Sequence, residues 1–272
     1  PNLNIVGYDI DKTIFSYALS NFGAAHYKIS LSNEDYLMAS WTQKYDAIIC
    51  NPPYLKFHDY DNATLIPLVN KKLQTHLNGF TNIYTLFLLK SLSQLKEYGK
   101  LAYIIPSEFL NSDYGVEVKR ELLKSGTLRH VIIVDFNQCV FDDALTTACV
   151  LLCQNIKTSN KVTFSTVKNM EDLSSFMRNS VSYNLKELDP TVKWKLYYEQ
   201  TQAGNYSHLV PFSTFAKVSR GIATGANEYF TFNLSKAKEY SIDEQNLLPC
   251  ICSAKDAKTP FFTKQDFEEL KS

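Results

Sequence analysis

Apolar runs with the length of strands alternate with runs that have helical spacing along residues 3–153. The predicted strands are 3–8, 27–31, 45–50, 100–106, 128–135 and 147–153, and the predicted helices are 11–22, 65–77, 82–98 and 114–125. Strands that alternate with helices favour a mainly parallel sheet covered on both faces. The chain is therefore predicted to form an α/β fold with a Rossmann-like, doubly wound sheet, whose ligands bind beyond the carboxyl ends of the strands.

The alternation fades after residue 155, where aromatic and β-branched residues mix with turn residues. Residues 207–212 have the composition of a domain boundary. We expect a sheet domain over residues 1–208 and a second, more irregular domain over residues 209–272.

Composition limits the classes of protein that this chain can belong to. The 28 basic and 28 acidic residues give no net charge, which counts mildly against nucleic-acid binding because phosphate neutralisation usually requires a basic excess. The six cysteines form no Cys-x-x-Cys pair and the five histidines show no metal-ligand spacing, so no metal site is predicted. Without an apolar run of membrane-spanning length or a secretory signal in its first 20 residues, the chain is expected to be a cytoplasmic protein.

Residues 51–54 read Asn-Pro-Pro-Tyr and close the apolar strand 45–50. The two prolines fix φ and remove two backbone donors, so the loop presents carbonyl acceptors in a stiff geometry. Asn51 adds a side-chain acceptor, and Tyr54 adds a flat ring for stacking. This combination suits the binding of a planar amino group, although a proline-rich turn after a strand is the simpler alternative.

The loop and its position resemble the amino-methyltransferases that use S-adenosylmethionine, most closely the DNA adenine-N6 methyltransferases of restriction-modification systems. Their signature is an (Asn/Asp)-Pro-Pro-(Tyr/Phe) loop, and the resemblance extends from Ile5 to Phe230. It implies methyl transfer to an adenine amino group within a specific DNA sequence, with Asn51 and the Pro52 carbonyl accepting both amino hydrogens. Positioning and electrostatics would then carry the rate without a covalent intermediate.

The same resemblance assigns the cofactor-binding residues. Asp9 follows the first strand, where a family carboxylate binds the ribose of S-adenosylmethionine; the alternative is that Asp9 or Asp11 caps the next helix, and we expect Asp11 to be the cap. Asp35 and Tyr36 match an acidic-aromatic pair whose carboxylate accepts from the cofactor adenine amine. A solvated acidic turn is the alternative for Asp35.

An adenine in a duplex must leave the stack before its amino group reaches the loop, so the resemblance also implies base flipping. Tyr54 would cover one face of the flipped base, next to Pro53 in the substrate-binding part of the loop. Phe141 lies just before the strand 147–153, where the family places a second stacking ring, although a core phenylalanine is an equal alternative.

Other segments indicate how this chain relates to the family. Asn82–Tyr84 and Pro106–Phe109 match family blocks around the site and are expected to be supporting structure. Residues 220–230 resemble the opening of a DNA target-recognition domain, with a plain glycine-containing hairpin as the alternative. The family's first strand and its glycine-rich cofactor loop are not found, since the sequence contains no Gly-x-Gly. We therefore expect a methyltransferase sheet lacking its first strand, followed by a partial target-recognition domain, with impaired cofactor binding.

Three other readings remain open at this point. A protein-glutamine methyltransferase uses the same loop to hold a planar amide, and a ribosomal-RNA guanine methyltransferase is a weaker candidate. Both are disfavoured by the long segment after residue 153. A non-catalytic fragment that binds DNA or a partner subunit is the third reading. The DNA methyltransferase reading implies double-stranded DNA as substrate and restriction or specificity subunits as candidate partners.

Overall fold

The described part of the chain divides into two units, Pro1–Ala203 and Gly204–Ser272. The computed structural model describes residues 3–22, 28–135, 147–156, 159–199, 210, 212–217, 226–251, 253, 255, 257, 259 and 261–270. The first unit contains the strands described below. In the part that the structure describes, no helix is long and apolar enough to cross a membrane.

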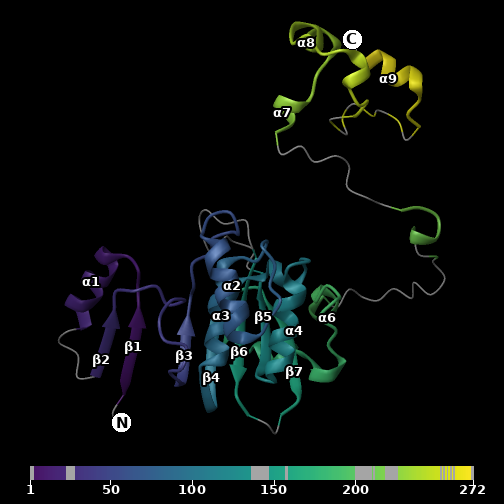
Figure 1. The fold of residues 1–272 in the computed structure, drawn as a ribbon. Helices are drawn as coiled ribbons and strands as arrows, with labels where there is room; N and C mark the ends of the chain where they lie inside the picture. Colours follow the sequence, from purple (N-terminus) through teal and green to yellow (C-terminus); the bar gives the residue numbers. More distant parts are fainter. Residues whose placement is uncertain are drawn as a thin grey trace. The chain divides into compact units, whose positions relative to one another are not determined.

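A six-stranded mixed sheet forms the centre of the first unit (Figure 1). Its strands, in spatial order, are β3 (Tyr45–Cys50), β4 (Leu95–Pro106), β6 (Ala148–Gln154), β5 (Leu128–Val134), β7 (Lys161–Val167) and β8 (Val181–Asn184). β3 pairs parallel with β4, β5 pairs parallel with β7, and β6 runs antiparallel between β4 and β5. The strands β3, β4, β5 and β7 therefore end at the same edge of the sheet. This confirms the predicted α/β class.

β1 (Asn4–Tyr8) and β2 (Lys28–Ser32) form a separate two-stranded parallel sheet, joined by α1 (Lys12–Phe22). Among the described residues, β1 and β3 each have a strand partner on one side alone. The side chain of Ile49 on β3 is 87% exposed. The hydroxyls of Tyr8 and Tyr45, 3.1 Å apart, connect the two sheets.

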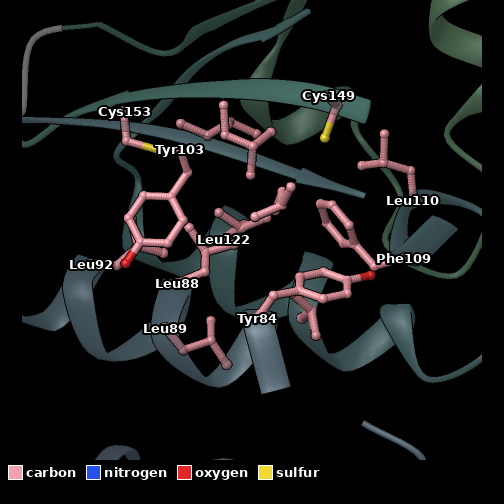
Figure 2. Close-up of a cluster of buried hydrophobic side chains, with 14 of the residues drawn as sticks. Tyr84, Leu88, Leu89, Leu92, Tyr103, Phe109, Leu110, Leu122, Cys149 and Cys153 are labelled. Carbon is pink, nitrogen blue, oxygen red and sulfur yellow. The ribbon is translucent and has the colours of Figure 1, made fainter. Parts of the chain in front are cut away.

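Helices α2 (Asn62–Leu73), α3 (Ile83–Ser93) and α4 (Gly115–Ser125) supply the cover of one sheet face. Figure 2 shows the core between them and the strands, which includes Tyr84, Leu88, Leu122, Tyr103 and Cys149. Burying each large apolar side chain stabilises the fold by about 1.5–3 kcal/mol. The opposite face is covered by Leu173 and Phe176, which pack on a smaller cluster. This second cover lies over β5, β6 and β7, whereas Ile49 on β3 is exposed, so the coverage of both faces that the alternation predicts is incomplete in the residues that the structure describes.

Several boundaries differ from the predicted ones. The helix predicted over 82–98 ends at Ser93, and β4 begins at Leu95, so Gly99 lies within a strand instead of ending a helix. A Cβ at Gly99 would lie 2.9 Å from the carbonyl oxygen of Lys96, which explains why glycine fits this strand irregularity. The helix predicted over 65–77 ends at Leu73, because Gln74 adopts a left-handed conformation with φ 56°.

The other helix ends follow the sequence closely. α4 stops at Gly126, whose φ of 65° is the left-handed conformation that glycine adopts without strain. The sequence did not predict β7 or β8. The remaining short helices of the first unit are α5 (Met170–Leu173), η1 (Ser107–Leu110), η2 (Phe176–Asn179), η3 (Leu185–Glu187) and α6 (Lys195–Tyr198).

The second unit contains short helices in the residues that the structure describes. They are η5 (Phe212–Thr214), α7 (Asn227–Phe230), α8 (Leu234–Glu239), η6 (Glu244–Asn246) and α9 (Lys264–Leu270). Its exposed aromatic side chains include Tyr229, Phe230 and Phe261.

Candidate active site

The Asn-Pro-Pro-Tyr loop leaves the carboxyl end of β3, directly beside β4. Asn51 and Pro53 are exposed, Pro52 is buried, and the Tyr54 side chain is 40% exposed. The Tyr54 hydroxyl donates to the side-chain oxygen of Asn51 at 2.5 Å and to the carbonyl of Ile104 on β4 at 3.1 Å. Burial raises the pKa of Tyr54, so this hydroxyl stays a donor at neutral pH. The loop therefore combines an amide oxygen, a stiff backbone and a partly open ring.

The start of α3 holds the far side of this loop. The side-chain oxygen of Asn82 accepts from the backbone N–H of Phe57 at 3.1 Å, and the N–H of Ile83 donates to the carbonyl of Leu55 at 3.2 Å. The ring of Tyr84 contacts the Tyr54 ring edge-on, with 6.4 Å between centroids. These contacts fix where Tyr54 stands, as expected of the Asn82–Tyr84 segment.

A carboxylate-centred cluster supports Asn82 in turn. The amide of Asn82 donates to Glu108 and to the hydroxyl of Tyr114, the latter at 3.0 Å. Tyr114 donates to Glu108 at 2.9 Å, and its hydroxyl lies 2.7 Å from that of Tyr84. Burial raises the pKa of both tyrosines, so both remain protonated. Glu108 thereby joins η1 to the start of α3, which is the supporting role predicted for Pro106–Phe109.

After β1, Asp9 and Asp11 make different hydrogen bonds, which decides between the two capping candidates that the sequence left open. Asp11 caps α1, because its carboxylate accepts from the N–H groups of Thr13 at 2.7 Å and Ile14 at 3.1 Å. One oxygen of Asp9 accepts from the N–H of Asp11 at 2.8 Å. The other Asp9 carboxylate oxygen has no hydrogen-bond partner among the described residues, so it is available to a ligand.

Asn33 is a site residue that sequence reasoning missed. Its amide donates to the carbonyls of Asp9 at 2.9 Å and Ile10 at 3.1 Å, which ties the end of β1 to the residue after β2. The available signal was its position, since an amide directly after the second strand faces the same edge as Asp9.

Asp35 begins a tight turn after β2. Its backbone carbonyl accepts from the N–H groups of Met38 at 3.0 Å and Ala39 at 2.9 Å, and one carboxylate oxygen accepts from Leu37 at 2.8 Å. Within the residues that the structure describes, its second carboxylate oxygen has no partner. The carboxylates of Asp9 and Asp35 therefore each keep one acceptor, which fits the hydroxyl groups and the exocyclic amine of a nucleoside such as that of S-adenosylmethionine.

Tyr36 anchors the same turn to α3. Its ring packs between those of Tyr8 and Phe87, with centroids 5.5 and 5.3 Å away. Its hydroxyl donates to the side-chain oxygen of Gln94 at 2.6 Å and lies 2.8 Å from the hydroxyl of Ser91. Burial raises the pKa of Tyr36 well above its ordinary value.

The Asp35 turn and the Asn-Pro-Pro-Tyr loop are linked through α3 and β4. The Ser91 hydroxyl lies 2.5 Å from that of Tyr103, and Tyr103 is the register partner of Cys50, the residue before Asn51. A chain of buried hydroxyls from Tyr36 through Ser91 to Tyr103 thus spans the two predicted parts of the site. The remaining predicted residue, Phe141, lies outside the described residues, as do residues 220–225.

The chain resembles restriction-modification methyltransferases in sequence and in fold. Residues 4–141 match the family model of the Eco57I restriction-modification methylase, and residues 197–272 match that of the C-terminal domain of the Type II methyltransferase M.Eco57I. The chain is 56% identical to the Type II methyltransferase M.AccI of Acinetobacter calcoaceticus, over 99% of this chain and 52% of that protein. It is 25% identical to the Type II restriction enzyme and methyltransferase RM.Eco57I of Escherichia coli, over 83% of this chain and 24% of that protein.

Solved structures share the fold at low sequence identity. The type IIG restriction endonuclease BpuSI superposes with a TM-score of 0.61 at 14% identity, over 96% of this chain and 36% of that one. A type I restriction-modification methyltransferase subunit from Streptococcus thermophilus gives a TM-score of 0.58 at 17% identity, over 70% of this chain and 47% of that one. The chain spans about half the length of M.AccI and a quarter of RM.Eco57I. On its sequence match and its α/β methyltransferase-like fold, the chain belongs to the Eco57I restriction-modification methylase family.

Proposed function

We propose that this protein transfers a methyl group from S-adenosylmethionine to the N6 amino group of an adenine flipped out of a specific DNA sequence, within a restriction-modification system. The observation that carries the proposal is the exposed side chain of Asn51 beside the stiff Pro52–Pro53 backbone and the partly open Tyr54 ring. Membership of the restriction-modification methylase family supports DNA as the substrate.

Asn51 and Pro52 would act on the amino group of the target base. The Asn51 side-chain oxygen and the Pro52 carbonyl each accept one amino hydrogen, which draws the nitrogen towards tetrahedral geometry. The nitrogen lone pair would then form a bond to the methyl carbon as the bond from that carbon to sulfur breaks, and one amino hydrogen would leave as a proton to solvent. Because these acceptors stabilise the charge that develops on nitrogen, they act mainly in the transition state.

Asp9, Asp35 and Tyr36 are proposed to hold S-adenosylmethionine, which supplies an electrophilic methyl group on sulfur. The available carboxylate oxygens of Asp9 and Asp35 provide the acceptors for its ribose hydroxyls and its adenine amine. Tyr36 fixes the Asp35 turn on α3. These contacts would contribute to the affinity and orientation of the cofactor, and they would not take part in the methyl-transfer step itself.

The flipped adenine is proposed to stack on Tyr54, beside Pro53, with Phe141 covering its other face. Each stacked ring contributes roughly 1–3 kcal/mol, which offsets much of the cost of unstacking the base. The Tyr84 ring and the Ile104 carbonyl hold Tyr54 in place before the base arrives.

The division of labour between the two parts of the chain is proposed as well. Residues 1–208 would form the catalytic domain, and residues 209–272 would begin the domain that recognises the DNA sequence. The separate unit Gly204–Ser272 and the family match over residues 197–272 support this division. The proposed partners are double-stranded DNA and restriction or specificity subunits, and the proposed location is the cytoplasm.

One assay tests the proposal against its competitors. The intact protein is incubated with methyl-labelled S-adenosylmethionine and duplex DNA, and the DNA is then digested to nucleosides. We expect the label in N6-methyl-2′-deoxyadenosine. We expect no such label with the Asn51→Ala variant. Label in a glutamine-containing protein substrate instead of DNA would identify a protein-glutamine methyltransferase. DNA binding without any transfer would identify a non-catalytic DNA-binding protein.

A further inference from the structure

The side chain of Lys90 is fully buried beneath the turn that begins at Asp35. Its ammonium nitrogen donates to the carbonyl of Tyr36 and, at 2.9 Å, to the carbonyl of Ala39. The same nitrogen lies 4.4 Å from the centroid of the Tyr36 ring and 4.8 Å from that of the Trp41 ring. Lys90 is therefore in contact with the turn through two hydrogen bonds and two aromatic faces.

A buried ammonium is costly to desolvate, and a leucine in this helix would pack without that cost. The cost is offset where the charge has close acceptors and ring faces, as it does here. The sequence of α3 is otherwise strongly apolar, with Leu86, Leu88 and Leu89 buried. Both hydrogen bonds of the Lys90 ammonium are with carbonyls of the turn, so Lys90 contributes to the position of the turn.

Two further carbonyls in and beside the turn also accept hydrogen bonds from side chains. The indole N–H of Trp41 donates to the carbonyl of Leu37 at 3.0 Å, and the amide of Gln94 donates to the carbonyl of Ser40 at 3.0 Å. The backbone N–H groups of the turn bind Asp35 itself, at its carbonyl and at one carboxylate oxygen. Because Lys90 binds two carbonyls of the turn and Asp35 binds its backbone N–H groups, the turn has little freedom to reorient the Asp35 carboxylate.

We propose that Lys90 is a positioning residue for Asp35, whose ammonium fixes the 35–39 turn and so keeps the second carboxylate oxygen of Asp35 available to the cofactor. The inference rests on the proposed function, in which Asp35 binds S-adenosylmethionine. The positive charge of Lys90 also lies close enough to interact with the charges of Asp35 and Glu34. Lys90 does not contact the reacting atoms; it sets cofactor affinity through Asp35.

The chain offers a matched control in Lys119 on α4. Its side chain is also buried, and its nitrogen donates to the carbonyls of Leu110 at 3.1 Å and Val192 at 2.7 Å. It lies 5.9 Å from the centroid of the Trp194 ring. The two lysines thus have the same chemistry, but Lys119 holds the loops at Leu110 and Val192, and it makes none of these contacts with the Asp35 turn.

The test compares Lys90→Met and Lys119→Met in the intact protein. Lys90→Met is expected to raise the KM for S-adenosylmethionine about tenfold or more, because two charge-assisted hydrogen bonds to the turn are lost, while kcat at saturating cofactor falls by less than about threefold. Lys119→Met is expected to leave this KM within about twofold of wild type. Calorimetric binding of S-adenosylhomocysteine gives the same comparison without turnover.

The position of the turn is measured separately with 5-fluorotryptophan and fluorine NMR. Lys90→Met should shift the Trp41 resonance, and Lys119→Met should shift that of Trp194, each assigned with a Trp→Phe variant. If Lys90→Met does not fold, Lys90→Gln is tested instead, because glutamine keeps a donor but carries no charge. Lys90→Gln is expected to raise the KM for S-adenosylmethionine as well, by a smaller factor.

An unchanged KM in a folded Lys90 variant would overturn the inference while leaving the proposed function intact. Equal rises in KM for the Lys90 and Lys119 variants would do the same, since they would indicate a general loss of stability. Failure of the wild-type protein to bind S-adenosylmethionine or S-adenosylhomocysteine would overturn the proposed function, and the positioning role with it.

Discussion

The hydroxyl of Tyr54 donates to the side-chain oxygen of Asn51 across 2.5 Å, so the residue proposed to stack on the base uses one acceptor position of the oxygen proposed to bind the amino group. In the proposed reaction this hydrogen bond competes with the entering base for the same oxygen. Tyr54→Phe is therefore expected to bind DNA with an unpaired target adenine a few-fold more tightly, because the ring remains and the competing donor is gone. Tyr54→Ala should weaken that binding by about 1–3 kcal/mol through lost stacking. Fluorescence titration with 2-aminopurine at the target position measures both, and weaker binding by Tyr54→Phe would contradict this role of the hydroxyl.

Asn51→Ala is expected to lower the rate of methyl transfer about 100-fold or more while DNA affinity stays close to wild type. In the proposed mechanism Asn51 stabilises the charge that develops on the amino nitrogen, and one such group typically contributes at least that factor. Single-turnover kinetics and a gel-shift titration on the same preparation separate the two effects. A variant that retains more than about a tenth of the wild-type rate would exclude the proposed mechanism.

Asp9→Ala is expected to weaken S-adenosylmethionine binding about tenfold without changing the DNA sequence that is methylated, because the lost oxygen is a ligand acceptor. Asp11→Ala is the matched control. It removes the cap of α1 and should cost about 0.5–2 kcal/mol of stability with little effect on cofactor affinity. Calorimetry measures the cofactor affinity of both variants, and thermal unfolding measures their stability. Equal cofactor affinity in wild type and Asp9→Ala would assign Asp9 a structural role.

Phe141→Ala should weaken binding to a mismatched target base, and Phe141→Trp should largely preserve it, because any broad aromatic face can stack. With 2-aminopurine at the target position, fluorescence should rise on binding and rise further with Phe141→Ala. A core phenylalanine would behave differently, since its removal costs about 3–5 kcal/mol of folding stability and lowers activity on every substrate alike. Loss of stability with unchanged fluorescence for each folded molecule would place Phe141 in the core.

Lys90 also predicts a pH dependence of stability. Burial lowers the pKa of Lys90 from 10.5 to about 8, against the opposing charges of Asp35 and Glu34. Between these two values the unfolded chain binds more protons than the folded chain, so the free energy of unfolding rises with pH there. Lys90 should contribute about 1–3 kcal/mol to the rise, since one pKa unit corresponds to about 1.4 kcal/mol.

Burial lowers the pKa of Lys119 to about 8 as well, so each lysine supplies part of the same rise. Urea unfolding of wild type, Lys90→Met and Lys119→Met is measured at pH 8, 9 and 10. The free energy of unfolding should rise less with pH in each variant than in wild type. A pH dependence identical to wild type in Lys90→Met would mean that Lys90 titrates as an exposed lysine.

The sequence alone determined the features that depend on local chemistry. The alternation of strand-length and helical runs predicted the ends of β1 to β6 within one residue, except the start of β4 at Leu95, which was predicted at residue 100. Gly126 ended α4, and Asp11 capped α1, because both effects act within one turn. The stiffness of the Asn-Pro-Pro-Tyr loop and its acceptors were also predictable, because Asn, two prolines and Tyr at the end of an apolar run define them directly.

The tertiary structure decided what depends on contacts between distant segments. The antiparallel insertion of β6 between β4 and β5, and the addition of β7 and β8, depend on pairing partners that no local pattern specifies. Lys90 reads as an ordinary surface residue in the sequence, yet it is buried because the turn 54 residues earlier supplies its acceptors. The partners of the Tyr36 hydroxyl, Ser91 on α3 and Gln94 directly after that helix, are likewise distant in the sequence. The local sequence determines which helix or strand a segment forms. The free energy of burying a polar group depends instead on the hydrogen-bond partners that the tertiary structure places next to it.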